Sequence, residues 1–386
     1  MDIATPDSVA GAAGSVSRSA AAPALVILNA RGAHVSTTAT TLASAPAGSL
    51  LHRIGASARA CDFGAPSRQA DGSYFVDVNP LWLSVVIDYL AHGVVTAPKM
   101  TPGVLAGVQA AADYLGLDAL ALECAARLAR IEGADASPDH TIKVRVVTAD
   151  DLHAHTGALD VFSRHRRKGA DLPFAIALLR RHPMKVVGHI LCEALGLAPT
   201  DTVFYACWMR RNTTLRPLAP LDMTAPTPLG DCWAECSRVI WLYAMKREPP
   251  VDLVPVASCW PSIRKAPPGI DVPVLIFVKV FDPASRYLSG PWHAFVASDA
   301  TVASALPTLL KAVDGSAHPI RGDDGVAVYE EVDNTKVRRV DMKGTFAQAE
   351  IETGDILWLC PRVAGLAPRI PMADYDWIAA PKGPRW

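Results

Sequence analysis

Alternating and helix-spaced hydrophobic positions divide the chain into three regions that predict regular structure. The first region, 24–131, predicts short strands followed by three helices. Asn79-Pro80 is typical of a helix start, because asparagine caps the unpaired N–H groups of a first turn and proline fits that turn. The apolar residues after this start recur at helical spacing and predict one inward-facing stripe: Trp82, Val85, Val86, Tyr89 and Leu90. This region is therefore expected to be a mixed domain that ends in a helical cluster.

The second region, 140–248, and the third region, 271–361, share one order of predicted elements: strands, one helix, then more strands. Alternation over 141–147 and 274–280 predicts the first strand of each region. The stretch between 208 and 239 is rich in Pro and Thr and is expected to be a loop. Together the two regions form a weak internal repeat, which is typical of two β-grasp, ubiquitin-like domains.

The segments outside these regions are predicted to be connections. Residues 1–23 are rich in Ala, Ser and Gly and are expected to be a disordered leader, since they lack the features of a targeting signal. Residues 133–139 and the Pro-rich 249–270 are expected to be linkers, and 362–386 a tail. The expected fold class is thus α+β and multidomain.

Composition and charge exclude two classes of protein. The 386 residues carry 37 Lys and Arg against 38 Asp and Glu, a formal net charge of −1. A protein that coats nucleic acid needs a large basic excess, which is missing here. Half of the residues are hydrophobic, but polar residues interrupt the longest apolar stretches (186–198 and 272–281) before they reach the length of a bilayer. We therefore expect neither nucleic acid nor a membrane among the partners.

The cysteine and histidine residues favour no catalytic, cofactor or metal site. The eight cysteines are scattered, without a CxxC pair, and are expected to be free thiols in a reducing compartment. None lies in a recognisable nucleophile context. His153, His155 and His165 lack a Cys or carboxylate partner at zinc-ligand spacing, and Cys232 and Cys236 are better explained as small core residues. The chain is therefore predicted not to be an enzyme.

Arg164–Lys168 is the densest charged run of the sequence. It is expected to be a solvated loop, and the alternative is a patch for nuclear import or for an acidic partner. The expected location of the protein is accordingly cytoplasmic, nuclear or both.

The first region resembles the BTB/POZ domain of the potassium-channel tetramerisation type. Leu28–Gly32 and the Thr-rich 36–42 are similar to that family's L-N-x-G-G and T-T…T-L patterns. Asp71–Asp77 resembles its D-G-x-Y-F-I-D block, and Val86–Gly93 its I-L-x-Y-L-x-x-G helix. The resemblance implies homo-oligomerisation into a ring, such as a tetramer or pentamer, and a possible cullin scaffold as partner.

The second and third regions resemble two ubiquitin-like modules in the C-terminal region of the herpesvirus-associated ubiquitin-specific protease (HAUSP). Phe281–Arg286, Val328–Val332 and Gly354–Ile356 are similar to its Y-D-P-x-T-R, L-Y-E-E-V and G-D-I patterns. The resemblance of the second region, carried by Val144–Asp151, is fainter. No protease core accompanies these modules, so the resemblance implies partner binding without catalysis.

In the resembled module an acidic turn before the last strand receives lysine side chains of short peptides. The corresponding stretch here contains Glu350, Glu352 and Asp355, which we take as the candidate partner-binding residues. Ala349 and Thr353 stand where that family has acids, so the turn is depleted in charge. Clustered carboxylates favour ammonium groups and steer their approach, which predicts a Lys-containing peptide as ligand.

These expectations combine into a non-enzymatic adaptor, which oligomerises through its BTB domain and binds proteins through ubiquitin-like modules in a ubiquitin ligase or deubiquitinase pathway. Two alternatives stay open: a purely structural oligomer, and a regulator or decoy that acts in trans on a ubiquitin-specific protease.

Overall fold

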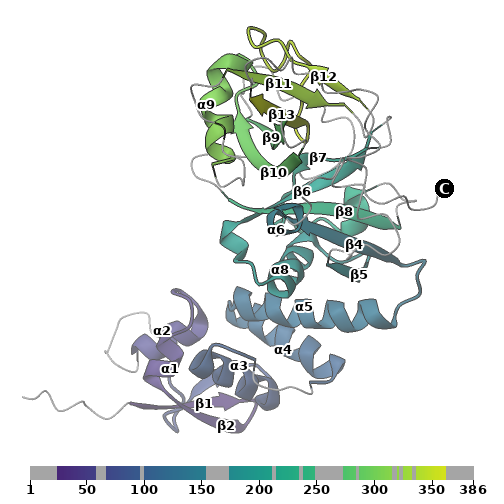
Figure 1. Cartoon of the computed structure of the whole chain (residues 1–386). Coiled ribbons are helices and arrows are strands. Elements are labelled where there is room, and N and C mark those ends of the chain that lie inside the picture. The colour runs from purple at the N-terminus through teal and green to yellow at the C-terminus, as the bar shows by residue number, and fades with distance from the viewer. Residues whose placement is uncertain are drawn as a thin grey trace, which may run out of the picture. The chain divides into compact units, whose positions relative to one another are not determined.

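A computed structural model describes most of the predicted elements (Figure 1). It covers residues 24–57, 67–95, 100–153, 174–210, 214–233, 238–247, 273–283, 287–314, 320, 325–332 and 336–361. The fold is mixed α/β with three sheets among these residues. The chain divides into two compact units, Met1–Cys124 and Ala125–Trp386, and each is described by itself. The expected leader, the 249–270 linker and the tail lie outside the described residues.

The N-terminal unit combines a small sheet with helices. Its sheet has the order β2-β1-β3, in which β1 runs antiparallel to β2 and parallel to β3. The strands are β1 (Leu25–Ala30), β2 (Ala33–Thr38) and β3 (Tyr74–Val76). The helices are α1 (Ala39–Ala43), α2 (Leu50–Ser57), α3 (Pro80–His92), α4 (Pro102–Leu115) and the first part of α5 (Asp118–Asp135).

Local capping explains where α3 begins and ends. The Asn79 side chain accepts a hydrogen bond from the Leu81 N–H at 3.0 Å, which confirms the predicted helix start. Gly93 ends the helix at φ 73°, a left-handed conformation that glycine adopts without strain. The predicted apolar stripe is rotated, however: the buried residues of α3 are Leu83, Val86 and Ile87. Trp82 is only partly buried, and its ring lies directly over Gly107 of α4, where a Cβ atom would come within 2.1 Å.

Helix α5 corrects one predicted boundary. The sequence predicts a linker from residue 133, but the helix continues to Asp135. Gly133 is buried, and a Cβ atom at this position would lie 2.4 Å from the carbonyl oxygen of Ala177. The glycine is therefore present because the backbones approach closely at this point, and the packing outweighs its poor helix propensity.

The C-terminal unit contains two five-stranded sheets with the same topology. The first sheet has the order β5-β4-β8-β6-β7 and the second β10-β9-β13-β11-β12. In each, the first and last strands of the region lie side by side and parallel, and every other pair is antiparallel. The shared order of elements that the sequence predicts is thus confirmed.

The elements of the first sheet region are β4 (Thr141–Thr148), α6 (Ala149–His153), β5 (Ala175–Leu179), α8 (Met184–Leu195), η1 (Pro199–Asp201), β6 (Thr202–Met209), β7 (Leu215–Pro220), η2 (Leu229–Cys232) and β8 (Val239–Lys246). Those of the second are β9 (Val274–Asp282), β10 (Tyr287–Val296), α9 (Val302–Ala312), β11 (Val326–Glu331), β12 (Val337–Arg339) and β13 (Ile356–Pro361).

Strand β7 lies where the sequence predicts only a loop. It contains Pro217 and Pro220 and occupies the edge of its sheet, paired with β6 alone. Proline has no N–H to donate and is confined to such edges, so its presence hides a strand from pattern analysis.

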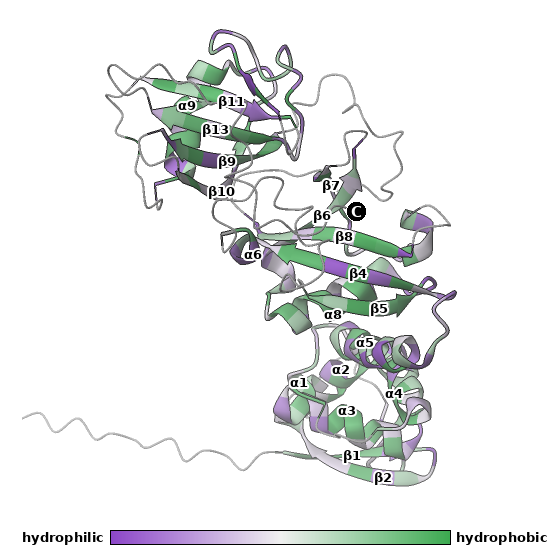
Figure 2. Ribbon diagram, turned by 45° about the vertical axis from the view of Figure 1, so that its right-hand side comes forward, coloured by the Kyte–Doolittle hydropathy of each residue, from purple (hydrophilic) through white to green (hydrophobic). Residues whose placement is uncertain are grey.

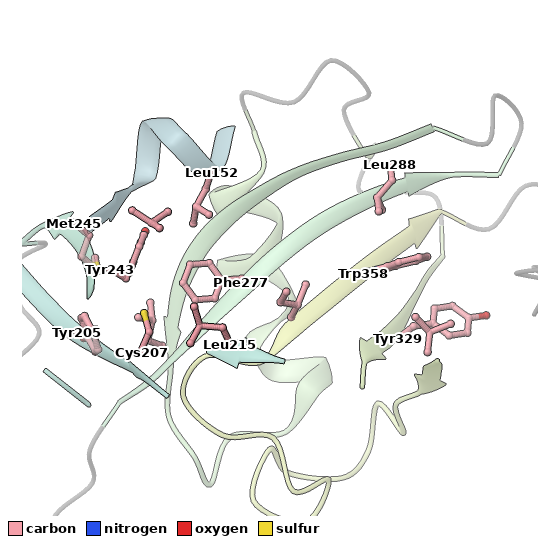
Figure 3. Close-up of a cluster of buried hydrophobic side chains, with 14 of the residues drawn as sticks. Leu152, Tyr205, Cys207, Leu215, Tyr243, Met245, Phe277, Leu288, Tyr329 and Trp358 are labelled. Carbon is pink, nitrogen blue, oxygen red and sulfur yellow. The ribbon is translucent and has the colours of Figure 1, made fainter. Parts of the chain in front are cut away.

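The two sheets of the C-terminal unit share a hydrophobic cluster. Strand β9 is buried on both faces: Val274, Ile276 and Val278 belong to the core beneath α9, whereas Leu275 and Phe277 pack with residues of the first sheet. Figure 3 shows Tyr243 and Phe277 within this cluster, and their rings meet edge to face at 5.2 Å between centroids. The sheets therefore form one packed body.

Figure 2 shows that the central strands β8 and β13 are largely hydrophobic, as this arrangement requires. Among the described residues, no helix combines the length and the apolar character needed to cross a membrane. The described cysteines are buried and form no disulfide, in agreement with the sequence: Cys124, Cys192, Cys207, Cys232 and Cys360. Burial raises the pKa of the Cys232 and Cys360 thiols to about 11, so neither is a reactive thiolate at neutral pH.

Candidate protein-binding site at the acidic turn

The acidic turn, residues 349–355, is the last part of the connection between β12 and β13 in the second sheet. Glu350 adopts a left-handed backbone conformation at φ 58°, and Ile351 anchors the turn in the core beneath α9. At the other end the Gly354 N–H donates to the Leu275 carbonyl at 2.7 Å, and the Phe277 N–H to the Asp355 carbonyl at 2.8 Å. The turn is thus fixed to the core and to the first strand of its own sheet.

The three candidate carboxylates occupy different environments. Glu350 and Glu352 are exposed, whereas Asp355 is buried. One oxygen of Asp355 accepts the Glu352 N–H at 2.7 Å, which closes the turn. The sequence groups the three residues, but Asp355 also has a structural role that the sequence does not reveal.

Arg210, which follows β6 in the first sheet region, contacts the acidic turn. Its Nη1 pairs with the Asp355 carboxylate, and its Nη2 donates to the Thr353 carbonyl at 3.3 Å. The Arg210 backbone is held by its N–H, which donates to the Thr214 carbonyl at 2.8 Å. A cation from one sheet region therefore already contacts the candidate site of the other.

Glu330 is a further acidic residue at the site, and the sequence analysis did not single it out. It lies on β11 opposite Arg338 of β12, whose Nε and Nη2 both donate to its carboxylate, at 2.9 and 2.6 Å. Burial raises the pKa of Glu330, and Asp355 adds to the rise, while Arg338 and Arg210 oppose it. The sequence does carry a signal for this residue: two adjacent glutamates, Glu330 and Glu331, follow the apolar residues of a predicted strand. A carboxylate that is buried in a strand usually has a cationic partner, so the pattern predicts an ion pair here.

A buried ionic cluster lies between the two sheets. Lys279 of β9 donates to Glu331 of β11 at 2.6 Å, and the Trp358 indole N–H donates to the same carboxylate oxygen at 2.8 Å. Arg216 of β7 approaches the other Glu331 oxygen at 3.8 Å. All three charged groups are almost completely buried, so the two sheets are joined by paired charges as well as by apolar contact.

Other predicted features are placed differently or are not described. The Arg164–Lys168 run, His155, His165 and Cys236 lie outside the described residues, and so does the His153 side chain. In the N-terminal unit, large apolar side chains are exposed on several elements and in the segment after α3: Leu25, Phe75, Leu81, Val94, Val104 and Tyr114.

Comparison with known families agrees with this architecture. Residues 26–125 match the BTB/POZ domain model, which covers the sheet and the helices of the N-terminal unit. The N-terminal domain is of the BTB/POZ type. The resemblance predicted from the motifs around Leu28 and Asp71 is thereby confirmed.

Residues 204–362 match the model described as the ICP0-binding domain of Ubiquitin-specific protease 7. This match starts within β6 and ends directly after β13, so it includes strands of both sheets, together with Arg210 and the acidic turn. The predicted resemblance of the C-terminal region to the HAUSP modules is confirmed as well. Both matched domain types are non-catalytic.

A curated relative points in the same direction. The chain is 25% identical over 190 residues to Ubiquitin carboxyl-terminal hydrolase 5 of Schizosaccharomyces pombe. The aligned part covers 48% of this chain but only 16% of that protein.

Proposed function

We propose that the protein is a non-enzymatic adaptor, which self-associates through its BTB domain and presents a pair of ubiquitin-like modules to partner proteins. One observation carries the proposal: a BTB/POZ match and a match to the ICP0-binding domain of Ubiquitin-specific protease 7 lie on the same chain. The first domain type implies oligomerisation and the second implies protein binding.

The assignment of the two sheets as β-grasp, ubiquitin-like modules is supported by their topology. Each places an antiparallel strand pair, then a helix (α8 or α9) and three further strands, so that the first and last strands are central and parallel. A parallel central pair requires a crossover connection, which the helix provides in both modules.

The exposed carboxylates of the acidic turn support a basic segment as ligand. Glu350 and Glu352 face solvent, and ammonium or guanidinium groups are the complementary partners of such carboxylates. We therefore propose that a Lys-containing peptide of a client protein binds at this turn, and that the oligomer links this client to a ubiquitin ligase, with a cullin as the scaffold.

Peptide binding is tested with the full chain and a fluorescent alanine peptide that carries two lysines. Glu350→Gln combined with Glu352→Gln should weaken binding about tenfold. Asp314→Asn is the matched control, because Asp314 is an exposed carboxylate of the same module that follows the C-terminal end of α9, whereas the N-terminal end of α9 contacts the segment before the turn. It should leave the affinity unchanged. Equal affinities for all three proteins would contradict the peptide site.

The ubiquitin connection is tested separately. A purified cullin should bind the full-length oligomer, and absence of binding would favour a purely structural oligomer. The distant similarity to a ubiquitin carboxyl-terminal hydrolase motivates a second candidate, a regulator in trans. If the added protein changes the rate of a purified ubiquitin-specific protease while no cullin binds, this second candidate replaces the first.

A further inference from the structure

Arg210 satisfies the acceptors of the acidic turn that an external cation would need. Its two terminal nitrogens contact the Asp355 carboxylate and the Thr353 carbonyl. The second Asp355 oxygen is already used by the Glu352 N–H. Carboxylate and carbonyl oxygens are also the acceptors that a peptide lysine or arginine would use. Arg210 and a basic ligand therefore require the same atoms.

A second arginine contacts the opposite end of the turn, and it differs from Arg210 in origin. Arg338 donates to the Ala349 carbonyl at 2.7 Å and pairs with Glu330, its direct cross-strand neighbour. Since this pair lies within one hairpin, Arg338 is a local support of the turn. Arg210 instead comes from the other module, 145 positions away in the sequence from Asp355.

The Arg210 side chain is able to leave the turn without unpacking the core. The exposed fraction of the Arg210 side chain is 29%, whereas that of its partner Asp355 is 4%. A partly exposed arginine has water as an alternative environment for its guanidinium group. The buried Asp355 has no such alternative, so a departing Arg210 leaves a carboxylate that favours replacement by another cation.

We propose that Arg210 is a built-in competitor of the basic ligand, so that the acidic turn is occupied from within the chain until a peptide cation displaces the arginine. This inference rests on the proposed function, because it concerns the regulation of the same turn. The exposed Glu350 and Glu352 attract the peptide first, and one of its cations then replaces the guanidinium at Asp355. A ligand with a single cation, which reaches only the exposed residues, binds more weakly.

The first test compares full-length wild-type protein, Arg210→Ala and Arg339→Ala with the fluorescent two-lysine peptide. If Arg210 occupies the turn in about nine of ten molecules, its removal tightens binding about tenfold, because the competent fraction rises to one. Arg339 is an exposed neighbour of Arg338 on β12, so Arg339→Ala removes the same charge without emptying the turn and should give a much smaller change. A peptide with norleucine in place of both lysines should not bind.

The outcomes separate this inference from the proposed function. If Arg210→Ala binds the peptide more tightly than wild type and Arg339→Ala does not, the result supports the peptide site and the competitor role. This also holds when binding by the wild-type protein is too weak to detect. Equal binding by wild type and Arg210→Ala overturns the competitor role and leaves the peptide site intact. Absence of binding by every variant overturns the peptide site and the competitor role together.

A second measurement is made on the wild-type protein and needs a conservative variant only for the assignment. In nitrogen-15-labelled wild-type protein, the Arg210 guanidinium signal is assigned by its loss in Arg210→Lys. Titration with the two-lysine peptide should shift this signal to the position of a solvated arginine, while the Arg338 signal changes less. An Arg210 signal that stays constant at saturating peptide would overturn the inference.

Discussion

The two units treat their apolar surface in opposite ways. In the N-terminal unit, large apolar side chains remain exposed; Leu81 retains 74% of its exposure and Leu25 69%. In the C-terminal unit, Leu275 and Phe277 of β9 project from the face opposite α9, but the first sheet covers them completely. Exposed apolar side chains that gather into a patch often mark a protein-interaction site. The BTB unit is thus suited to association with further copies, whereas the tandem sheets complete their own core.

The same difference extends to charge. The tandem sheets bury Lys279, Glu331 and Arg216 in their shared interface, and pair every one of them. We therefore propose that binding in this unit depends on polar groups that are left at the surface, such as Glu350 and Glu352. We expect affinity for other copies to reside in one unit and affinity for clients in the other.

The largest effect is expected from loss of the buried ionic cluster. Glu331→Ala leaves Lys279 in the interface without its carboxylate, which should lower the free energy of unfolding by about 3–5 kcal/mol. Denaturant unfolding of the full chain, followed by tryptophan fluorescence, measures the loss. Glu352→Ala is the control: it removes an exposed glutamate and should change the free energy of unfolding by less than about 0.5 kcal/mol. Equal stability of the two variants would mean that the sheets do not depend on this cluster.

Gly354→Ala should have the next largest effect. The glycine has φ 91°, and a Cβ atom there would lie 2.2 Å from the Pro217 carbonyl oxygen of the first sheet. Strain and the clash together should cost about 2–3 kcal/mol and push the sheets apart. Gly344→Ala is the control, because its nearest neighbour would be 3.6 Å away. If both alanine variants unfold alike, the sheets do not pack closely at this turn.

Charges placed on the exposed apolar residues of the BTB unit should weaken self-association. Phe75→Glu combined with Leu81→Glu is expected to raise the dissociation constant of the oligomer about tenfold or more, with little loss of folding stability. Analytical ultracentrifugation over a concentration series measures it. Val239→Glu places the same charge on an exposed apolar position of the first sheet and should leave association unchanged. If Val239→Glu weakens association and the double variant of the BTB unit does not, association resides in the C-terminal unit and the prediction is wrong.

A smaller effect, dependent on pH, is expected where the end of α5 packs on the first sheet. His182 is buried, its Nδ1 accepts the Leu179 N–H, and its Nε2 lies 3.2 Å from the Glu132 carboxylate. Burial lowers the pKa of His182 below its ordinary 6.5, although Glu132 opposes the shift. The folded state therefore resists protonation more than the unfolded state does. This stabilisation is complete above about pH 6.5 and is lost as the pH falls through the lowered pKa.

Unfolding of the full chain at pH 7.5 and 5.5 checks this expectation. The wild-type protein should lose more stability between the two values than His182→Gln does. An identical loss in both proteins would contradict the role of His182. Burial raises the pKa of Glu132, but hydrogen bonds from His182 and Arg181 outweigh it and lower the pKa overall. Gln at position 182 keeps a side-chain N–H donor for Glu132, so this carboxylate should stay ionised at both pH values in both proteins.

Local chemistry made much of the fold predictable from the sequence. The Asn79 cap, the strand at 141–147 and the order of elements in the two repeats follow from signals within a few residues. Strand β7 was missed because its prolines are typical of loops, and the end of α5 because Gly133 serves a tertiary contact. Both misses occur where packing outweighs local preference.

The candidate site was predictable only in part. The motif resemblance points to Glu350, Glu352 and Asp355 as candidate residues. The alternating pattern of β9, in contrast, does not reveal that the first sheet covers the second face of this strand. The pairing of Asp355 with Arg210 joins positions far apart in the sequence, and no local pattern contains it. Sequence thus located the turn, and the structure revealed that its most buried acid already has a partner.

The central claim is that the BTB unit assembles the chain while the tandem sheets remain free to bind clients. Light scattering of the full-length protein at increasing concentrations, coupled to size exclusion, tests it most directly. We predict a discrete mass that is a multiple of 41.0 kDa and that falls toward 41.0 kDa for Phe75→Glu with Leu81→Glu. A wild-type mass of 41.0 kDa at every concentration would contradict the claim.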